Sequence, residues 1–229
     1  MRVEDAQQLN ATYLFQDLSQ EDLAALEQRM PLKMVETGNL IYSPEEHAEV
    51  LFLLKNGRVR LFRLSPDGKA LTTAIVEPGS VFGEMALLGQ GMQDSFAEAL
   101  ENCAIYTLNR RDVQDVLLAD PRVARRLLEL VSRRLAETER KLEDFAFKNV
   151  PQRLASLLLQ LAHVRPDQAE EAVALPARYT HQQLAEMIGT YRETATKVLN
   201  DFRQQGWVRI DHGRIQLLDL AALREMASG

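Results

Sequence analysis

The feature that most constrains this chain is a change of hydrophobic period near residue 120. Residues 121–147 are nearly free of helix breakers, and their pattern is helical. Six residues there follow one another at alternating steps of three and four and form a seam: Leu128, Val131, Leu135, Thr138, Leu142 and Phe145. This is the a/d pattern of a coiled coil, and at 1.5 Å per residue it is about 26 Å long. Its charged flanks favour a parallel or antiparallel partner helix; the alternative is a helix packed on its own domain.

The part of the chain before this helix consists of short apolar runs separated by turns. Strands are predicted over residues 39–43, 50–54, 59–64, 71–76 and 103–108. Between two of them, Pro66-Asp67-Gly68 predicts a hairpin, because glycine supplies the positive φ of such a turn. Short strands at this spacing indicate a jelly roll or barrel, and a helix over about residues 20–28 precedes them.

Pro151 follows the long helix and marks a boundary. A second apolar helix is expected over residues 152–164, followed by a loop over residues 165–177. We therefore expect three parts, which are a β-roll over residues 1–120, a helix over residues 121–148 and a C-terminal domain over residues 149–229.

Residues 180–206 have the pattern of two short helices joined by a tight turn. Thr180 and Gln183 form a capping box that begins the first helix, and Gly189 ends it. Thr190 and Glu193 form a second candidate capping box. Two helices joined in this way make a helix-turn-helix, whose second helix enters the major groove of DNA.

One face of the second helix carries residue types that recognise base edges. Arg can hold a guanine bidentately, Glu can accept from cytosine, and Lys can reach guanine, each contact discriminating by ~1–3 kcal/mol. The candidate base-reading residues are Arg192, Glu193, Thr196 and Lys197. The alternative is a solvated helix face whose charges have no function.

A predicted hairpin directly after this helix favours the DNA-binding interpretation. Its strands are residues 207–210 and 214–217, with Asp211-His212-Gly213 as the turn. A helix-turn-helix followed by a β-wing is a DNA-binding unit, in which Arg209 and Arg214 can contact phosphates.

The formal net charge of −6 is unevenly distributed. Residues 1–147 carry 17 basic and 24 acidic side chains, whereas residues 148–229 carry 10 basic and 9 acidic ones. The excess of acidic side chains lies in residues 1–147, so it does not argue against DNA binding by residues 148–229. No signal peptide or membrane-spanning segment is predicted, so we expect a cytoplasmic protein.

The sequence resembles the cyclic-AMP receptor protein and fumarate–nitrate regulator family of bacterial transcription factors. The resemblance rests on the glycine-punctuated strands, the long helix, Val81-Phe-Gly-Glu-Met-Ala-Leu-Leu88, and Gly189-Thr-Tyr-Arg-Glu-Thr194 followed by Lys197. It implies an α+β fold with an N-terminal double-stranded β-helix (jelly-roll) effector domain, a long dimerisation helix and a C-terminal winged helix-turn-helix. It also implies a homodimeric activator that binds double-stranded DNA at palindromes of the TGTGA-N6-TCACA kind and contacts RNA polymerase.

The resemblance also assigns roles by position. It implies that Arg192, Glu193 and Lys197 read bases. Lys197 stands where the receptor protein has an arginine, and lysine lacks the bidentate fork, so looser readout is expected at that base. The implied backbone contacts are Thr180, Gln182 and the wing residues Arg209, His212 and Arg214.

The implied effector pocket departs from the family pattern. In cyclic-AMP binders a short cassette begins with Gly-Glu, whose Glu meets the ribose, and ends with an Arg that meets the cyclic phosphate. Gly83, Glu84 and Ser95 match this cassette, but Asp94 stands in place of the arginine. Residues 70–109 contain no Lys or Arg that could replace it.

A cyclic phosphate beside Asp94 would meet repulsion in place of a charge-assisted hydrogen bond worth ~1.5–3 kcal/mol. Thr138 matches a long-helix threonine that meets the adenine, which is one contact and not the phosphate anchor. The sequence therefore predicts no cyclic-AMP effector and no cofactor. The alternative is the same DNA-binding role gated by cyclic AMP or by another small ligand in the roll.

Other functional classes find little support in the sequence. An enzyme built on a metal-binding jelly roll needs clustered His and Glu ligands, and the roll has only His47. We expect no catalytic residues and no metal site. Cys103 is the single cysteine and lies in an apolar strand, which predicts a buried small side chain, with a redox role as the alternative.

Overall fold

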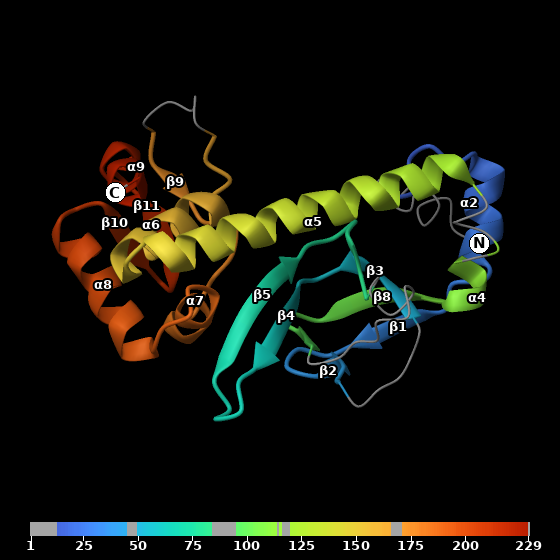
Figure 1. The fold of residues 1–229 in the computed structure, drawn as a ribbon, viewed down its shortest axis with the longest axis horizontal. Helices are drawn as coiled ribbons and strands as arrows, with labels where there is room; N and C mark the ends of the chain where they lie inside the picture. Colours follow the sequence, from blue (N-terminus) through green and yellow to red (C-terminus); the bar gives the residue numbers. More distant parts are fainter. Residues whose placement is uncertain are drawn as a thin grey trace. The chain divides into compact units, whose positions relative to one another are not determined.

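The computed structural model of the chain describes residues 13–44, 50–83, 95–113, 115, 120–165 and 171–228. Its elements follow the chain order shown in Figure 1. They pack as two compact units, residues 1–135 and 136–229, and the division falls within helix α5 (Pro121–Phe147). The three-part division by function remains a prediction.

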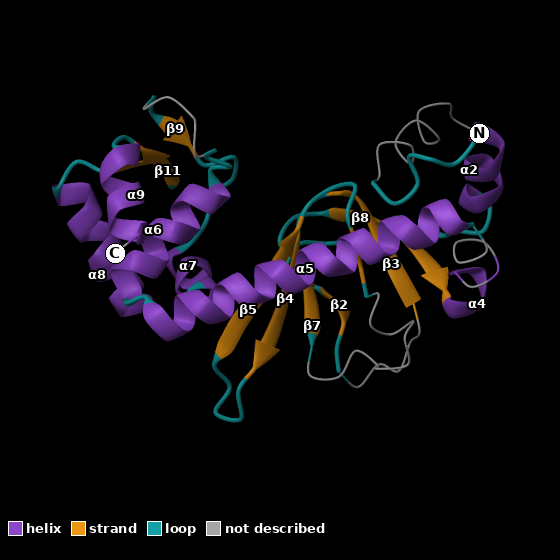
Figure 2. Ribbon diagram, turned by 45° about the horizontal axis from the view of Figure 1, so that its top comes forward, coloured by secondary structure: helices purple, strands orange, loops and turns teal. Residues whose placement is uncertain are grey.

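The first unit contains two four-stranded antiparallel sheets, drawn as orange arrows in Figure 2. The strand orders are β1-β8-β3-β6 and β2-β7-β4-β5. The strands are β1 (Leu32–Val35), β2 (Leu40–Tyr42), β3 (Val50–Asn56), β4 (Val59–Leu64), β5 (Ala70–Val76), β6 (Val81–Phe82), β7 (Phe96–Ala99) and β8 (Cys103–Asn109). The five predicted strands are confirmed with small shifts at their ends, and β1, β6 and β7 were not predicted.

Strand β3 is buried on both faces because its side chains divide between two cores. Phe52 and Leu54 lie in the roll interior, where the Phe52 ring stacks on Phe82 with centroids 5.0 Å apart. Leu51 and Leu53 lie in a second core on the opposite face of the sheet. This double burial explains why β3 reads as a continuous apolar run instead of an alternating one.

The second core is closed by helices. Helix α2 (Gln20–Glu27), which confirms the predicted early helix, contributes Leu23 and Leu26. Helix α5 contributes the buried Val123, with Leu127 and Leu130 packed against the cluster. A short helical turn, α4 (Arg110–Asp112), follows β8.

The predicted seam lies on a different face of α5 from these core contacts. Its leucines are largely exposed to solvent: Leu128 by 69%, Leu135 by 59% and Leu142 by 69%. The first unit therefore packs on α5 through residues other than these leucines, and a large apolar stripe of the helix stays accessible.

The second unit begins with helix α6 (Val150–Leu161). Asn149 and Gln152 form a capping box there, and Pro151 occupies the first turn, where its missing N–H costs nothing. The helix therefore starts two residues earlier than predicted. The expected loop over residues 165–177 contains a short strand, β9 (Val173–Ala174), which pairs with the wing strand β11 (Arg214–Leu217). Helix α9 (Leu220–Ser228) packs on α6.

A substitution at Gly57 tests the close backbone packing inside the roll. Its φ is +88°, and an added Cβ would lie 2.7 Å from both the Asn102 carbonyl oxygen and Cys103 Sγ. Gly38 has a similar φ of +84° with nothing within 4 Å of such a Cβ. We expect Gly57→Ala to lower the free energy of unfolding by about 1–3 kcal/mol more than the control Gly38→Ala, measured by urea unfolding. Equal losses would show that this close approach is absent.

Candidate nucleic-acid interface

The helix-turn-helix consists of α7 (His181–Met187) and α8 (Arg192–Gln204). The predicted capping box of α7 is confirmed. The Gln183 amide N–H donates to Thr180 Oγ1 at 3.1 Å, and the Thr180 N–H donates to the Gln183 side-chain oxygen at 2.8 Å. Gly189 adopts φ +64° in the turn, which is why the chain can reverse there.

The second predicted capping box is wrong. Helix α8 begins at Arg192 with Tyr191 as its N-cap, and no side chain caps it. Thr190 belongs to the turn, since its N–H donates to the Ala185 carbonyl at 2.9 Å. Uncapped N–H groups at the start of a helix are suited to a phosphate oxygen.

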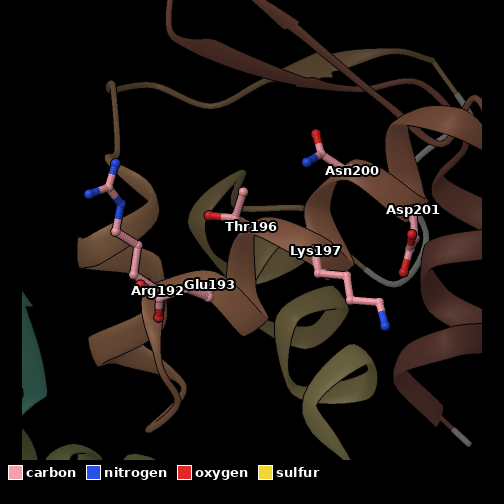
Figure 3. A pocket seen from close by; sticks show the side chains of 6 residues that line it. All are labelled: Arg192, Glu193, Thr196, Lys197, Asn200 and Asp201. Carbon is pink, nitrogen blue, oxygen red and sulfur yellow. The ribbon is translucent and has the colours of Figure 1, made fainter.

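Helix α8 has one buried and one exposed face. The buried face is apolar and consists of Ala195, Val198, Leu199 and Phe202. The predicted base-reading residues lie together on the other face, where Figure 3 shows Arg192, Glu193, Thr196 and Lys197 lining one surface depression. The structure thus places all four predicted residues in a single site.

Two further residues of this depression were not predicted. Asn200 and Asp201 line it as well, one helical turn after Thr196 and Lys197. The spacing of four residues is visible in the sequence, but the predicted base-reading face covers only the first two turns of the helix. An amide and a carboxylate at these positions extend the polar lining of the depression.

Thr196 differs from its neighbours in being tied to the first helix of the motif. His181 Nδ1 lies 2.9 Å from Thr196 Oγ1, and the pair is partly buried. The next residue, Gln182, donates from its side-chain amide to the carboxylate of the buried Glu186, one turn later in α7, at 2.7 Å. Thr180 and Gln182 are both exposed at the start of α7, where a DNA backbone could reach them.

The predicted wing is confirmed as β10 (Val208–Asp211) paired with β11. His212 and Gly213 both have positive φ, 45° and 77°, as a two-residue type I′ hairpin turn requires. Arg209, His212 and Arg214 are exposed, and Arg209 Nη2 donates to the Gln216 side-chain oxygen at 2.5 Å. The wing thus offers two guanidinium groups and an imidazole at the surface of the second unit.

Arg153 of α6 connects the helix-turn-helix to the end of α5. Its Nε donates to the Ile188 carbonyl at 3.0 Å and its Nη1 to the Lys148 carbonyl at 2.7 Å. Its guanidinium also lies over the Phe145 ring, 5.2 Å from the centroid. One side chain therefore fixes the motif's turn against the last residue of the seam.

The predicted effector pocket is only partly within the described structure. Glu84 and Asp94 lie outside the described residues, as does His47. Gly83 follows β6 with φ +81°, and an added Cβ would lie 2.8 Å from the Val50 carbonyl oxygen, so the backbone there requires glycine. Ser95 immediately precedes β7, and Thr138 lies on the exposed side of α5.

Cys103 is fully buried in the roll, and its thiol donates to the carbonyl oxygens of Glu101 at 3.2 Å and Arg58 at 3.4 Å. Burial raises the pKa of the Cys103 thiol, which favours the unreactive protonated form. Within the described part of the chain, no three His, Cys, Asp or Glu residues gather as a metal site, and no helix is long and apolar enough to cross a membrane.

Comparison with known proteins agrees with this architecture. Residues 32–120 match the cyclic nucleotide-binding domain, and residues 152–226 match the Crp-like helix-turn-helix domain. The cyclic AMP receptor protein of Thermus thermophilus is 31% identical over 216 residues, which cover 94% of this chain and 97% of that protein. The chain belongs to the cyclic-AMP receptor protein and fumarate–nitrate regulator (CRP/FNR) family.

Two further comparisons show the same relationship. The transcriptional regulator SdrP of Thermus thermophilus is 37% identical over 171 residues, or 75% of this chain and 80% of that protein. A crystal structure of a CRP/FNR transcriptional regulator from the same organism has a TM-score of 0.69 at 33% identity, covering 87% of this chain and 99% of that one. The predicted fold class is therefore confirmed, and the chain is a CRP-like transcription regulator with a DNA-binding helix-turn-helix.

Removal of Arg192 tests the base-reading surface. We expect Arg192→Ala to weaken binding to a selected operator by about 1–3 kcal/mol, or about 5- to 150-fold, and to relax specificity at one base pair. The control is Arg203→Ala, which removes the same charge from the exposed last turn of α8. Fluorescence anisotropy on operator and random duplexes gives both affinities. An equal loss on the two duplexes would assign Arg192 to phosphate contact alone.

Proposed function

We propose that this regulator acts as a homodimer that binds palindromic sites of the TGTGA-N6-TCACA kind and activates transcription through contact with RNA polymerase. The observation that carries the proposal is the placement of Arg192, Glu193 and Lys197 on the exposed face of the first two turns of α8. These are the turns of a recognition helix that reach base edges in the major groove.

The exposed seam of α5 supports the homodimer. Leu128, Leu135 and Leu142 are separated by seven residues and remain largely exposed. A second copy of the helix supplies the same apolar stripe, and charges of both signs flank it, at Arg133 and Glu137 among others. Two copies of α8 would then face two half-sites about 34–36 Å apart on one side of DNA.

We further propose that cyclic AMP is not the effector. Asp94 stands at the cassette position of the phosphate anchor. Three arginines of the first unit could be considered as substitutes, but each has another partner. Arg60 pairs with Glu98 at 3.2 Å, Arg58 pairs with Glu101 at 2.7 Å, and Arg134 donates to the Val81 carbonyl oxygen. Recruiting one of them to a phosphate would break an existing interaction.

The second candidate is the same DNA-binding role gated by cyclic AMP or by another small ligand. It is favoured by the match of residues 32–120 to the cyclic nucleotide-binding domain and by the retained Gly83, Glu84 and Ser95. A ligand without a phosphate would be compatible with Asp94.

The oligomeric state is tested by placing a charge in the seam. We expect the wild-type chain to sediment at twice its monomer mass and Leu135→Glu to shift it to the monomer, because a buried seam cannot hold two facing carboxylates. The control is Ala136→Glu, which adds the same charge one residue away, outside the seam and also exposed. A monomeric wild-type protein, or equal behaviour of both variants, would contradict the seam assignment.

Nucleotide binding is tested by calorimetry on the wild-type protein and on Asp94→Arg. We expect no saturable cyclic-AMP binding at micromolar concentrations for the wild type. Asp94→Arg should bind about 10- to 100-fold more tightly, because it adds a charge-assisted hydrogen bond worth ~1.5–3 kcal/mol. Micromolar binding by the wild-type protein would establish the second candidate instead.

A further inference from the structure

The hydroxyl of Thr196 is held by the first helix of the helix-turn-helix. His181 is the first residue of α7, directly after the N-cap Thr180. The capping box therefore fixes the backbone position from which the His181 ring projects. His181 Nδ1 lies at hydrogen-bond distance, 2.9 Å, from Thr196 Oγ1. The two residues are 15 positions apart, and the hydrogen bond joins the two helices of the motif.

This hydrogen bond orients the two groups on the Thr196 β-carbon. The β-carbon of threonine carries a hydroxyl and a methyl in different staggered positions, and its χ1 angle has few accessible values in a helix. With the oxygen directed at α7, the methyl points elsewhere. Thr196 also lines the depression between Arg192 and Asn200, and its oxygen and methyl carbon diverge there in Figure 3.

We propose that Thr196 reads a thymine through the 5-methyl group of the base, and that His181 is the positioning residue that holds Thr196 in the required rotamer. The proposal rests on the proposed function, in which α8 lies in the major groove. The thymine methyl projects into that groove, and an apolar contact with a threonine methyl is a recognised way to read it. Arg192, Glu193 and Lys197 would supply the polar contacts around this apolar one.

Deoxyuridine substitution tests the proposal, because it removes only the 5-methyl group of the base. The full-length protein is first used to select its preferred duplex from random DNA. Each thymine is then replaced by deoxyuridine, symmetrically in both half-sites, and affinities are measured by anisotropy. We expect one position at which replacement weakens the wild-type protein by about three- to fivefold per half-site, the effect of one buried methyl-sized group.

Two variants of Thr196 separate its methyl from its hydroxyl. Thr196→Ser keeps the hydroxyl and should bind the thymine and deoxyuridine duplexes equally. Thr196→Val replaces the hydroxyl by a second methyl group, and its single preferred rotamer in a helix needs no hydrogen bond to His181, so this variant should still prefer thymine. If the wild type binds both duplexes equally at every position, or if Thr196→Ser still prefers thymine, the proposal is overturned.

Variants of His181 test the positioning role by the ratio of the two affinities, which a general loss of stability would not change. His181→Phe keeps the ring but not the nitrogen, and should bring the thymine-to-deoxyuridine ratio close to one. His181→Asn places an amide near the position of Nδ1 and should restore the ratio. An unchanged ratio in His181→Phe would overturn the positioning role. Failure of selection to recover any preferred duplex would instead contradict the proposed function.

Discussion

Helix α5 carries apolar side chains on two faces, and the first unit buries only one of them. Val123, Leu127 and Leu130 close the core beneath the sheet that contains β3, whereas Leu128, Leu135 and Leu142 stay exposed. Exposing such a stripe to water is unfavourable, so the helix is suited to a second copy of itself. The proposed dimer, the palindromic site and the paired recognition helices all depend on this division of one helix into two faces.

Within the second unit, Arg153 connects that helix to the DNA-binding surface. It bonds the carbonyl of Lys148, just after α5, and the carbonyl of Ile188, in the turn of the helix-turn-helix. Hydrogen bonds from a charged donor are among the stronger ones in proteins. The turn, and α8 after it, are thereby fixed relative to the end of the seam at Phe145, which the same guanidinium covers.

Periodicity and turn residues were sufficient to predict much of this structure. The exposed face of α8, the wing and the first capping box follow from spacings of two to four residues. Strands β6 and β7 were missed because they are two and four residues long and are defined by their pairing partners. The second predicted capping box does not form, because the Thr190 N–H donates to the Ala185 carbonyl and Thr190 therefore belongs to the turn. The contact between His181 and Thr196 depends on how two helices pack, which no local pattern encodes.

If two recognition helices act together on one palindrome, binding must depend on the spacing of the half-sites. Footprinting of the full-length protein should show two protected half-sites one helical turn apart, bound in a single step by two chains. An insertion of about five base pairs places the half-sites on opposite faces of the DNA, since one turn is about 10–10.5 base pairs. Affinity should then fall to that of an isolated half-site. Affinity that does not depend on spacing would show that the two recognition helices do not act together.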